Sequence, residues 1–462
     1  MTRDAAIARA HACFDSGDFE RDLARLVAIP TESQTEAGLP HCRRYLSEAM
    51  EPAFAEMGFD CRIFDNPVPG CGPVLLAERH EADGLPTILG YGHGDVIRGL
   101  EEQWTKGRGP WQAAREGDRL YGRGTADNKG QHWTLMQALK AVLETRGRLG
   151  FNAKFLIETG EENGSKGLRE VMETDLDAFR ADVFIASDGP RVRIDRPTVS
   201  LGARGAMNFD LVCHLREGGH HSGNWGGALA DPAALLAHAI ACIVGPTGRI
   251  EVPQWRPAPP SPLVRELLAD VTLDPGPDGP VPDPGWGEPG FSPAENVYAW
   301  NSFAVLAMIS GNPSGPVNAI APWARAHCQL RYIAGTDTGD ILPALRRHLD
   351  RHGHHLVAIE EAPEANRAGY AASRTEPDNP WVTRVRESVR RTTGQEPAVL
   401  PQMGGSICNE LFTDLLGIPA IWIPHSYAGC SQHAPDEHII LPMFREALGI
   451  MAGLYWDLGE PG

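Results

Sequence analysis

Apolar residues in the first 200 positions follow two different periods. Helical spacing predicts helices over 20–30, 41–57 and 129–146. Short, continuous apolar runs predict buried strands. These runs cover 74–77, 87–91, 154–157 and 183–186. Because strands and helices alternate along this part of the chain, the pattern predicts an α/β sheet.

The pattern changes near residue 200. Met207, Phe209 and Leu211 alternate with polar residues, which predicts a half-exposed strand. A helix, two strands, a helix and a strand are then predicted over 231–245, 303–310, 324–333, 339–352 and 354–361. The order β-α-β-β-α-β is that of the ferredoxin-like unit. We therefore expect residues 200–365 to form a separate domain. This domain is inserted into a discontinuous domain of residues 1–199 and 366–462. In the latter, a helix over 380–392 and an apolar run over 418–423 resume the α/β pattern.

One segment of the insert is rich in proline. Residues 253–293 hold 12 of the 38 prolines, which argues against regular elements and predicts an ordered loop or lid edge. Trp255, Trp286 and Phe291 supply side chains that can pack. The competing interpretation is a disordered linker.

Composition and charge exclude several classes of protein. The net charge of −18 disfavours a nucleic-acid partner. No apolar run reaches the ~18 residues of a transmembrane helix, and the first residues lack the apolar core of a signal peptide. The nine cysteines are scattered without a Cys-x-x-Cys pair. This usage indicates a reducing cytoplasm and argues against a disulfide framework or a cysteine zinc site.

Ionisable residues follow the predicted strands. They are His93, Asp95, Glu161, Glu162, Asp188 and His433, and Asp127 stands at the start of the helix over 129–146. Ligands of open α/β sheets bind beyond the carboxyl ends of the strands. Each residue alone is compatible with a surface or capping role, but their joint placement favours a metal site.

His93 and His433 offer two imidazoles. Asp127, Asp188 and one of Glu161 and Glu162 offer three carboxylates. This set of ligands suits zinc, with manganese or cobalt as alternatives. Five ligands are too many for one catalytic zinc and suit two metal ions about 3.5–4 Å apart, bridged by a carboxylate and a water. Asp127 is the candidate bridge. One of Glu161 and Glu162 would bind metal while its neighbour takes a proton from the water. Asp95 is placed to accept the second N–H of His93 and fix its tautomer.

Several motifs resemble one co-catalytic zinc peptidase family, that of acetylornithine deacetylase, succinyl-diaminopimelate desuccinylase, carboxypeptidase G, aminoacylase and carnosinase. The matching segments are His93-Gly94-Asp95, Tyr121–Gly130, Gly160–Ser165, Ser187-Asp188 and His433, in family order. The resemblance implies a mixed-sheet α/β catalytic domain with a ferredoxin-like lid and dimerisation domain. It also implies two metal ions, one held by His93 and Asp188, the other by Glu162 and His433, with Asp127 bridging and Glu161 as general base.

Further residues are implied by the same resemblance. His221, in the turn Gly219–Gly223, would stabilise the oxyanion, often from the partner subunit of a dimer, although the preceding His220 departs from the family pattern. Asn318 and Arg331 resemble a segment that grips a substrate carboxylate. The residues Gly404, Gly405 and Ser406 resemble the substrate loop, where small side chains let the backbone approach the ligand. The competing interpretations are a solvated histidine, an exposed arginine and a plain turn before a helix.

These observations predict a cytoplasmic, homodimeric enzyme that uses metal to hydrolyse an amide bond beside a free carboxylate. A dipeptide or an N-acyl amino acid would be its substrate. Two alternatives stay open, namely a carbamoyl or ureido amidohydrolase and a non-catalytic small-molecule binding protein on the same fold. Catalysis by the thiols of Cys408 or Cys430 is disfavoured.

Overall fold

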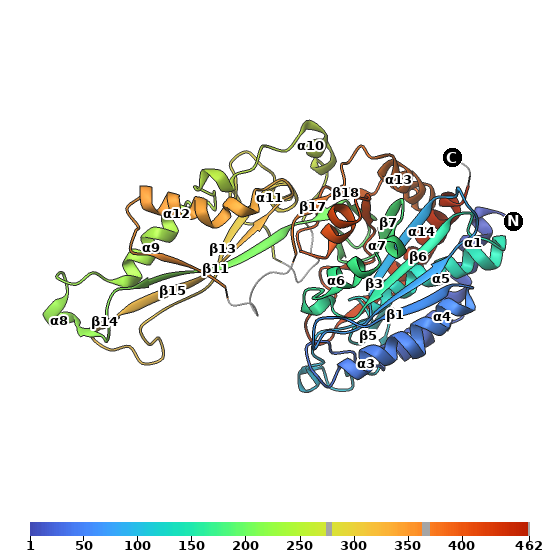
Figure 1. Ribbon diagram of the computed structural model, residues 1–462, viewed down its shortest axis with the longest axis horizontal. Coiled ribbons are helices and arrows are strands. Elements are labelled where there is room, and N and C mark those ends of the chain that lie inside the picture. The colour runs from blue at the N-terminus through green and yellow to red at the C-terminus, as the bar shows by residue number, and fades with distance from the viewer. Residues whose placement is uncertain (274–279, 363–369, 461–462) are drawn as a thin grey trace. The chain divides into compact units, whose positions relative to one another are not determined.

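A computed structural model of the chain describes residues 1–273, 280–362 and 370–460. The chain divides into two compact units (Figure 1). The first unit comprises Met1–Gly202, Leu267–Val281 and Arg374–Gly462, and the second comprises Ala203–Glu266 and Pro282–Ser373. Residues 267–273 and 280–281 thus group with the first unit, whereas the sequence assigns them to the insert. The expected boundary between 365 and 366 lies outside the described residues.

An eight-stranded mixed sheet forms the centre of the first unit, in the order β1-β2-β6-β3-β7-β19-β9-β18. The strands are β1 Asp60–Phe64, β2 Val74–Arg79, β3 Thr87–His93, β6 Asn152–Glu158, β7 Val183–Ala186, β9 Thr198–Ser200, β18 Ala398–Leu400 and β19 Ala420–Trp422. Neighbours β6, β3, β7 and β19 run parallel, so their carboxyl ends meet at one edge. The predicted mixed α/β sheet is therefore confirmed.

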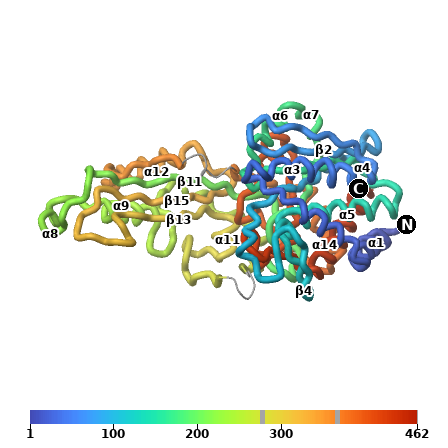
Figure 2. Tube along the Cα trace, turned by 90° about the horizontal axis from the view of Figure 1, so that it is seen from below, coloured from blue at the N-terminus to red at the C-terminus, as the bar shows by residue number. Residues whose placement is uncertain are grey.

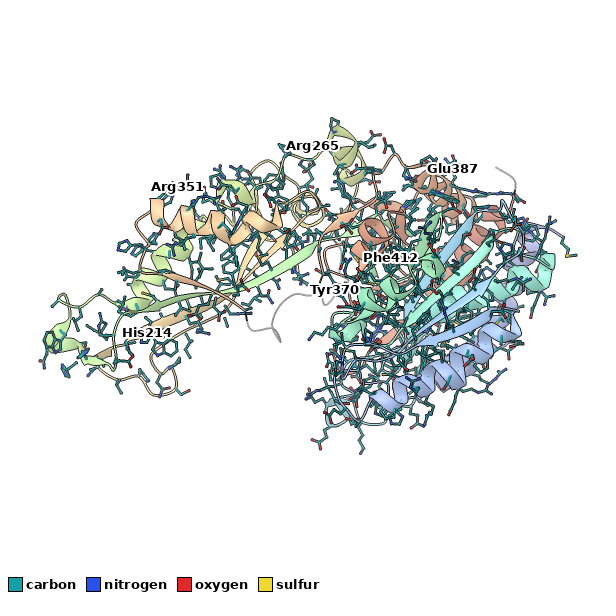
Figure 3. The ribbon with its side chains drawn as sticks, in the orientation of Figure 1. His214, Arg265, Arg351, Tyr370, Glu387 and Phe412 are labelled. Carbon is teal, nitrogen blue, oxygen red and sulfur yellow. The ribbon has the colours of Figure 1, made fainter. Side chains whose placement is uncertain are left out.

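Helices cover both faces of this sheet. In Figure 2, α6 and α7 lie on one side of β2, and α5, α14 and α1 lie on the other. The helices are α1 Arg3–Asp15, α2 Asp18–Val27, α3 Leu39–Arg44, α4 Glu51–Glu56, α5 Lys129–Arg146, α6 Leu168–Thr174, α7 Leu176–Phe179, α13 Pro380–Thr393 and α14 Leu441–Leu458, with π-helical turns η1 Tyr45–Met50 and η7 Leu411–Leu415. Phe412 of η7, labelled in Figure 3, stacks on Phe184 of β7 with ring centroids 3.8 Å apart.

Helix α5 has the bounds that the apolar spacing predicts, whereas the pattern did not predict α14. Nearly every side chain of α14 is buried, so the helix lacks the polar face that marks an amphipathic helix in a sequence. Within the described residues, no helix combines the length and apolar character needed to cross a bilayer.

The second unit is built on a four-stranded antiparallel sheet in the order β13-β15-β11-β16. Its main elements are β11 Gly205–His214, α9 Pro232–Ile243, β13 Ser302–Ser310, β15 Trp323–Tyr332, α12 Ile341–Arg351 and β16 Ala358–Glu361. Both helices pack against one face of the sheet, around the buried Leu211, Leu236 and Leu345 (Figure 1). This arrangement confirms the predicted ferredoxin-like order.

The proline-rich segment contains regular elements, so the expectation of a loop without them is wrong for its described residues. Three short helical turns begin at prolines, namely η4 Pro253–Trp255, α10 Pro262–Leu268 and α11 Pro293–Tyr298. Proline fits the first turn of a helix because the amide hydrogen that it lacks has no partner within the helix there. Trp255 is fully buried and donates its indole N–H to the carbonyl of Ile341 over 2.9 Å. Residues 274–279 of the segment lie outside the described residues.

Shorter elements complete the chain. They are β4 Ala114–Glu116, β5 Arg119–Tyr121, β8 Pro190–Arg191, β10 Gly202–Ala203, β12 His220–His221, α8 Ser222–Trp225, β14 Ala319–Ile320, β17 Ser373–Arg374, β20 Ser426–Tyr427 and β21 His438–Ile440, with 3₁₀ turns η2 Glu101–Gln103, η3 Glu161–Asn163 and η5 Thr338–Asp340.

Candidate metal centre

Two histidines contact opposite oxygens of one carboxylate at the carboxyl edge of the large sheet. His93 Nε2 lies 2.9 Å from Asp127 Oδ1, and His433 Nε2 lies 3.0 Å from Asp127 Oδ2. Asp188 Oδ2 lies 3.6 Å from His93 Nε2, and Glu162 Oε2 lies 3.0 Å from His433 Nε2. The structure therefore brings together the five metal ligands that the sequence predicts.

These side chains form two groups that share Asp127. His93, Asp127 and Asp188 form a buried group, and Asp127, Glu162 and His433 form a second group that is more open to solvent. Within each group the possible ligand atoms lie within 4.8 Å of one another. Imidazole nitrogens and carboxylate oxygens fit zinc, manganese or cobalt, and a shared carboxylate fits a pair of ions.

The ends of three parallel strands place most of these residues. His93 ends β3, Asp188 follows β7, and the turn with Glu161 and Glu162 follows β6. His433 lies on a loop after β20, with a left-handed backbone at φ +57°. Non-glycine residues rarely adopt this conformation, so the surrounding loop must hold it in place.

Asp95 orients both the histidine and the glutamate pair. Its carbonyl lies 3.1 Å from His93 Nδ1, which orients the imidazole so that Nε2 faces Asp127. Its buried carboxylate accepts the backbone N–H groups of Glu161 over 3.2 Å and of Glu162 over 3.1 Å. The hydroxyl of Ser33 donates to the same carboxylate over 2.7 Å. The sequence predicts the contact to His93, but not the contacts to the glutamate turn.

Burial and mutual repulsion shift the pKa values of the carboxyl groups. Burial, followed by the charge of Asp127, raises the pKa of Glu162 to about 7 and that of Asp188 to about 6. Burial also raises the pKa of Glu161 well above its usual range, although the charge of His93 opposes this effect. Asp127 differs because hydrogen bonds with His433 and His93 outweigh its burial and hold its pKa below the usual range. The cluster thus concentrates negative charge that divalent cations would neutralise.

The pKa values of the two histidines are also raised. Hydrogen bonds with Asp127 and Glu162 raise the pKa of His433 to about 11. Burial lowers the pKa of His93, but hydrogen bonds with Asp127 and Asp95 outweigh it, so this pKa lies well above the usual range. A metal must displace these protons, since only neutral imidazole is a ligand, and we therefore expect metal binding to release protons at neutral pH.

The carboxylate of Glu437 holds the loop that carries Asp127, and no sequence pattern predicted this role of Glu437. Its buried carboxylate accepts the backbone N–H groups of Gly124, Ala126 and Asp127 over 2.9–3.1 Å, and Arg123 Nη1 over 2.8 Å. Glu437 lies four residues after His433, a spacing that carries no signal without the fold. The glutamate therefore fixes the backbone that carries Asp127.

The candidates for substrate contact in the second unit fall into two places. His221 on β12 pairs with Ala319 on β14, and the carbonyl of Asn318 accepts the N–H of Ser222 over 2.9 Å, so His221 and Asn318 lie close together. The His221 ring is exposed, and its Nδ1 accepts the N–H of Gly223 over 3.1 Å.

Arg331 lies elsewhere in the second unit, on β15, where its Nε donates to Gln329 Oε1 over 2.9 Å. The buried Arg204, which the sequence analysis missed, lies near it. Burial, followed by the charge of Arg331, lowers the pKa of Arg204 to about 10. Two neighbouring guanidinium groups favour an anionic ligand.

Gly404, Gly405 and Ser406 lie in the first unit, between β18 and η7. A Cβ atom added to Gly405 would meet no other atom within 4 Å. The space beside this backbone is therefore open, as the predicted approach of a ligand requires.

The shared carboxylate, the two flanking histidines and the adjacent glutamate pair define the class of dimetal hydrolase sites. The model of Peptidase family M20/M25/M40 matches residues 89–457, and the chain belongs to this family. Members of the family are metal-dependent peptidases and amidohydrolases that bind two metal ions. The resemblance inferred from the motifs is confirmed, and so is the predicted class of enzyme.

Several relatives are dipeptidases. The cysteinylglycine-S-conjugate dipeptidase of Corynebacterium striatum is 26% identical over 363 residues, which are 76% of each chain. The Beta-Ala-His dipeptidase of Homo sapiens is 31% identical over 241 residues, covering 51% of this chain and 44% of that protein. The crystal structure of human carnosine dipeptidase 1 has a TM-score of 0.74 at 21% identity and covers 98% of this chain and 99% of that one, which shows the shared fold.

The proposed bridging role of Asp127 predicts how its removal changes the metal content. Asp127→Ala should reduce the bound metal from about two equivalents to less than one, because both groups lose a ligand. Asp188→Ala is the matched control and should retain about one equivalent, because it belongs to one group alone. Elemental analysis by mass spectrometry after removal of loosely bound ions measures both. Two equivalents in Asp127→Ala would contradict the bridging role.

Proposed function

We propose that this chain hydrolyses the amide bond of a dipeptide or an N-acyl amino acid, next to a free carboxylate. Two divalent metal ions would be its cofactors, zinc in the first place and manganese or cobalt as alternatives. The observation that carries the proposal is the placement of the two Asp127 oxygens between two ligand groups. The dipeptidases among its relatives support the choice of substrate class.

The residues of the first unit have distinct roles in this proposal. When bound, the metal ions polarise the scissile carbonyl and lower the pKa of the attacking water. His93 and Asp188 would hold one ion, Glu162 and His433 would hold the other, and Asp127 would be a ligand in both groups. Asp95 fixes the backbone of Glu161. The Glu161 carboxylate takes a proton from the attacking water and passes it to the leaving amine.

The remaining candidates would bind the substrate. His221 donates a hydrogen bond to the oxyanion that forms when water attacks the carbonyl. Arg331, next to Arg204, pairs with the substrate carboxylate, which excludes peptide bonds in the interior of a longer chain. Asn318 and the segment 404–406 add polar contacts to the substrate backbone.

The general base can be separated from metal binding. Glu161→Gln should lower kcat by about 100- to 10,000-fold, because an amide cannot take the proton of the attacking water. Metal content should stay at the wild-type value, since Glu162 is the ligand in the adjacent position. Steady-state kinetics and elemental analysis on the same preparation test this. Activity within a few-fold of wild type would show that another group is the base.

The carboxylate contact can be tested with paired substrates. Arg331→Ala should raise KM for a dipeptide by roughly 10- to 100-fold with a smaller change in kcat, because a charge-assisted hydrogen-bonded pair is lost. The same dipeptide with a C-terminal amide is the control, and its hydrolysis should change little between wild type and variant. An equal effect on both substrates would place the carboxylate contact at another residue.

We also propose a homodimer formed through β13. This edge strand of the four-stranded sheet exposes Val305, Leu306, Met308 and Ile309 by 38–53%. A long apolar edge strand has unpaired backbone groups along one side and favours pairing with another strand. A second copy, related by twofold symmetry, offers the same strand in the antiparallel direction.

Charge on this edge should separate the subunits. The double variant Leu306→Lys/Ile309→Lys should sediment as a monomer in analytical ultracentrifugation at concentrations where the wild type is a dimer. Leu356→Lys is the matched control, because Leu356 is 50% exposed on the same unit but lies outside β13, and it should remain dimeric. A dimeric double variant would place the interface elsewhere.

For its compartment we propose the reducing cytoplasm. All nine cysteines lie in the described residues and are free thiols. Such thiols persist where glutathione and thioredoxin keep them reduced.

The net charge of −18 also gives no reason to expect a nucleic-acid partner.

A hydrolysis screen read by mass spectrometry tests the proposed substrate class. Protein loaded with zinc, manganese or cobalt is offered dipeptides, N-acetyl and N-succinyl amino acids, and ureido acids. We expect cleavage of amides beside a free carboxylate, and loss of cleavage when a chelator is added. Cleavage of ureido acids alone would favour a carbamoyl or ureido amidohydrolase. Inactivity of the metal-loaded protein on every compound would contradict the proposal.

A further inference from the structure

The side chain of Gln131 forms hydrogen bonds with three segments of the chain, two of which carry proposed metal ligands. Gln131 lies in the first turn of α5 and is fully buried. Its Nε2 donates to the carbonyl of Ala126 over 2.9 Å. Its Oε1 accepts the hydroxyl of Ser187 over 2.8 Å and the backbone N–H of His425 over 2.9 Å. One amide thus satisfies three polar groups from distant parts of the sequence.

Two of these partners stand directly before proposed metal ligands. Ala126 precedes Asp127, and Ser187 precedes Asp188. Asn128 strengthens the second connection because its Nδ2 donates to the carbonyl of Ser187 over 2.8 Å. Ser187 is therefore held through its hydroxyl and its carbonyl by the start of α5. The first turn of α5 therefore connects the two backbone segments that carry Asp127 and Asp188.

The hydrogen bonds of Gln131 involve the backbone segments of one ligand group more directly than those of the other. Asp188 belongs to the buried group with His93 and Asp127, whereas the second group adds Glu162 and His433. Glu162 is held by Asp95, and His433 has an exposed side chain on a separate loop. A change at Gln131 therefore acts first on the spacing between Asp127 and Asp188.

We infer that Gln131 is a positioning residue that sets the distance between the Asp127 and Asp188 carboxylates, and with it the metal affinity of the His93–Asp127–Asp188 group. The inference rests on the proposed metal ligands. Partners that orient metal ligands contribute about 10- to 100-fold to metal affinity, and an amide that fixes two ligands at once belongs among them. A general contribution of Gln131 to folding is the competing explanation, because any buried hydrogen-bonded amide also stabilises the native state.

Three variants break the connection at different points. Gln131→Met keeps the length of the side chain and removes all three hydrogen bonds. Gln131→Glu keeps an acceptor for Ser187 and His425 but, when ionised, loses the donor to Ala126. Ser187→Ala removes only the bond on the Asp188 side and is the mildest of the three. Gln137→Met is the matched control, because Gln137 lies on the same helix and contacts Cys13 instead of a ligand-bearing loop.

The measurement is the dissociation constant for zinc, determined by calorimetric titration of the metal-free protein with a competing chelator. Each variant is placed in the wild-type chain and in a Glu162→Gln background, in which only the His93–Asp127–Asp188 group keeps all its proposed ligands. We expect the dissociation constant of this group to rise by about 10- to 100-fold in Gln131→Met and by about tenfold in Gln131→Glu and Ser187→Ala. Gln137→Met should change it less than twofold.

Melting of the metal-free proteins separates positioning from folding. Dissociation constants within twofold of wild type in all folded variants, together with a lower Tm, would overturn the inference and leave Gln131 a structural residue. If Gln131→Met does not fold, Gln131→Glu and Ser187→Ala decide in the same way. A wild-type chain that binds no zinc would overturn the proposed metal site as well, whereas two tightly bound ions with unaffected variants would overturn this inference alone.

Discussion

The buried carboxylate of Asp127 is the contact on which the candidate site depends. Its two oxygens lie 2.9 and 3.0 Å from imidazole nitrogens that come from opposite ends of the chain. A buried charge is unfavourable unless it is paired and hydrogen-bonded. The two imidazoles are these partners, while Glu437 accepts the backbone N–H of Asp127 and Gln131 donates to the carbonyl of Ala126, which fixes the neighbouring backbone. The carboxylate thus has one orientation in which it can contact two cations.

Electrostatic repulsion explains why this arrangement is suited to metal ions. Glu161, Glu162 and Asp188 share the buried site with Asp127, and burial raises the pKa of each of these three carboxyl groups. In the metal-free protein, their negative charge is relieved by protons on the carboxyl groups and on the two histidines. Divalent cations can replace those protons and restore every ligand to its coordinating form. Bound divalent cations would offset the cost of burying these carboxylates in their ionised form.

Some parts of the fold and the site are predictable from local sequence. Helix α5 has apolar residues at helical spacing and begins at Lys129, two residues after Asp127, so its bounds follow from the period of its residues. His93 and Asp188 stand at the ends of continuous apolar runs, and parallel strands bring such ends to one edge of a sheet. Helix α14 escaped prediction because it is buried on nearly every side and lacks a continuous polar face. The turns within the proline-rich segment escaped because proline argues against a helix interior but not against a first turn.

The sequence alone determined the α/β class, the ferredoxin-like insert, the residues of the candidate metal centre and the family, because each depends on residue type, local period or short motifs. Only the tertiary structure showed that the two oxygens of Asp127 face different histidines. It also showed that Asp95 holds the turn of Glu161 and Glu162, that Glu437 and Gln131 bond to the backbone beside Asp127, and that Arg204 lies near Arg331. These contacts join residues that are far apart in the chain or separated by irregular loops. Hydrogen bonds between such segments depend on how the strands and helices pack, and no local pattern of residues encodes that packing.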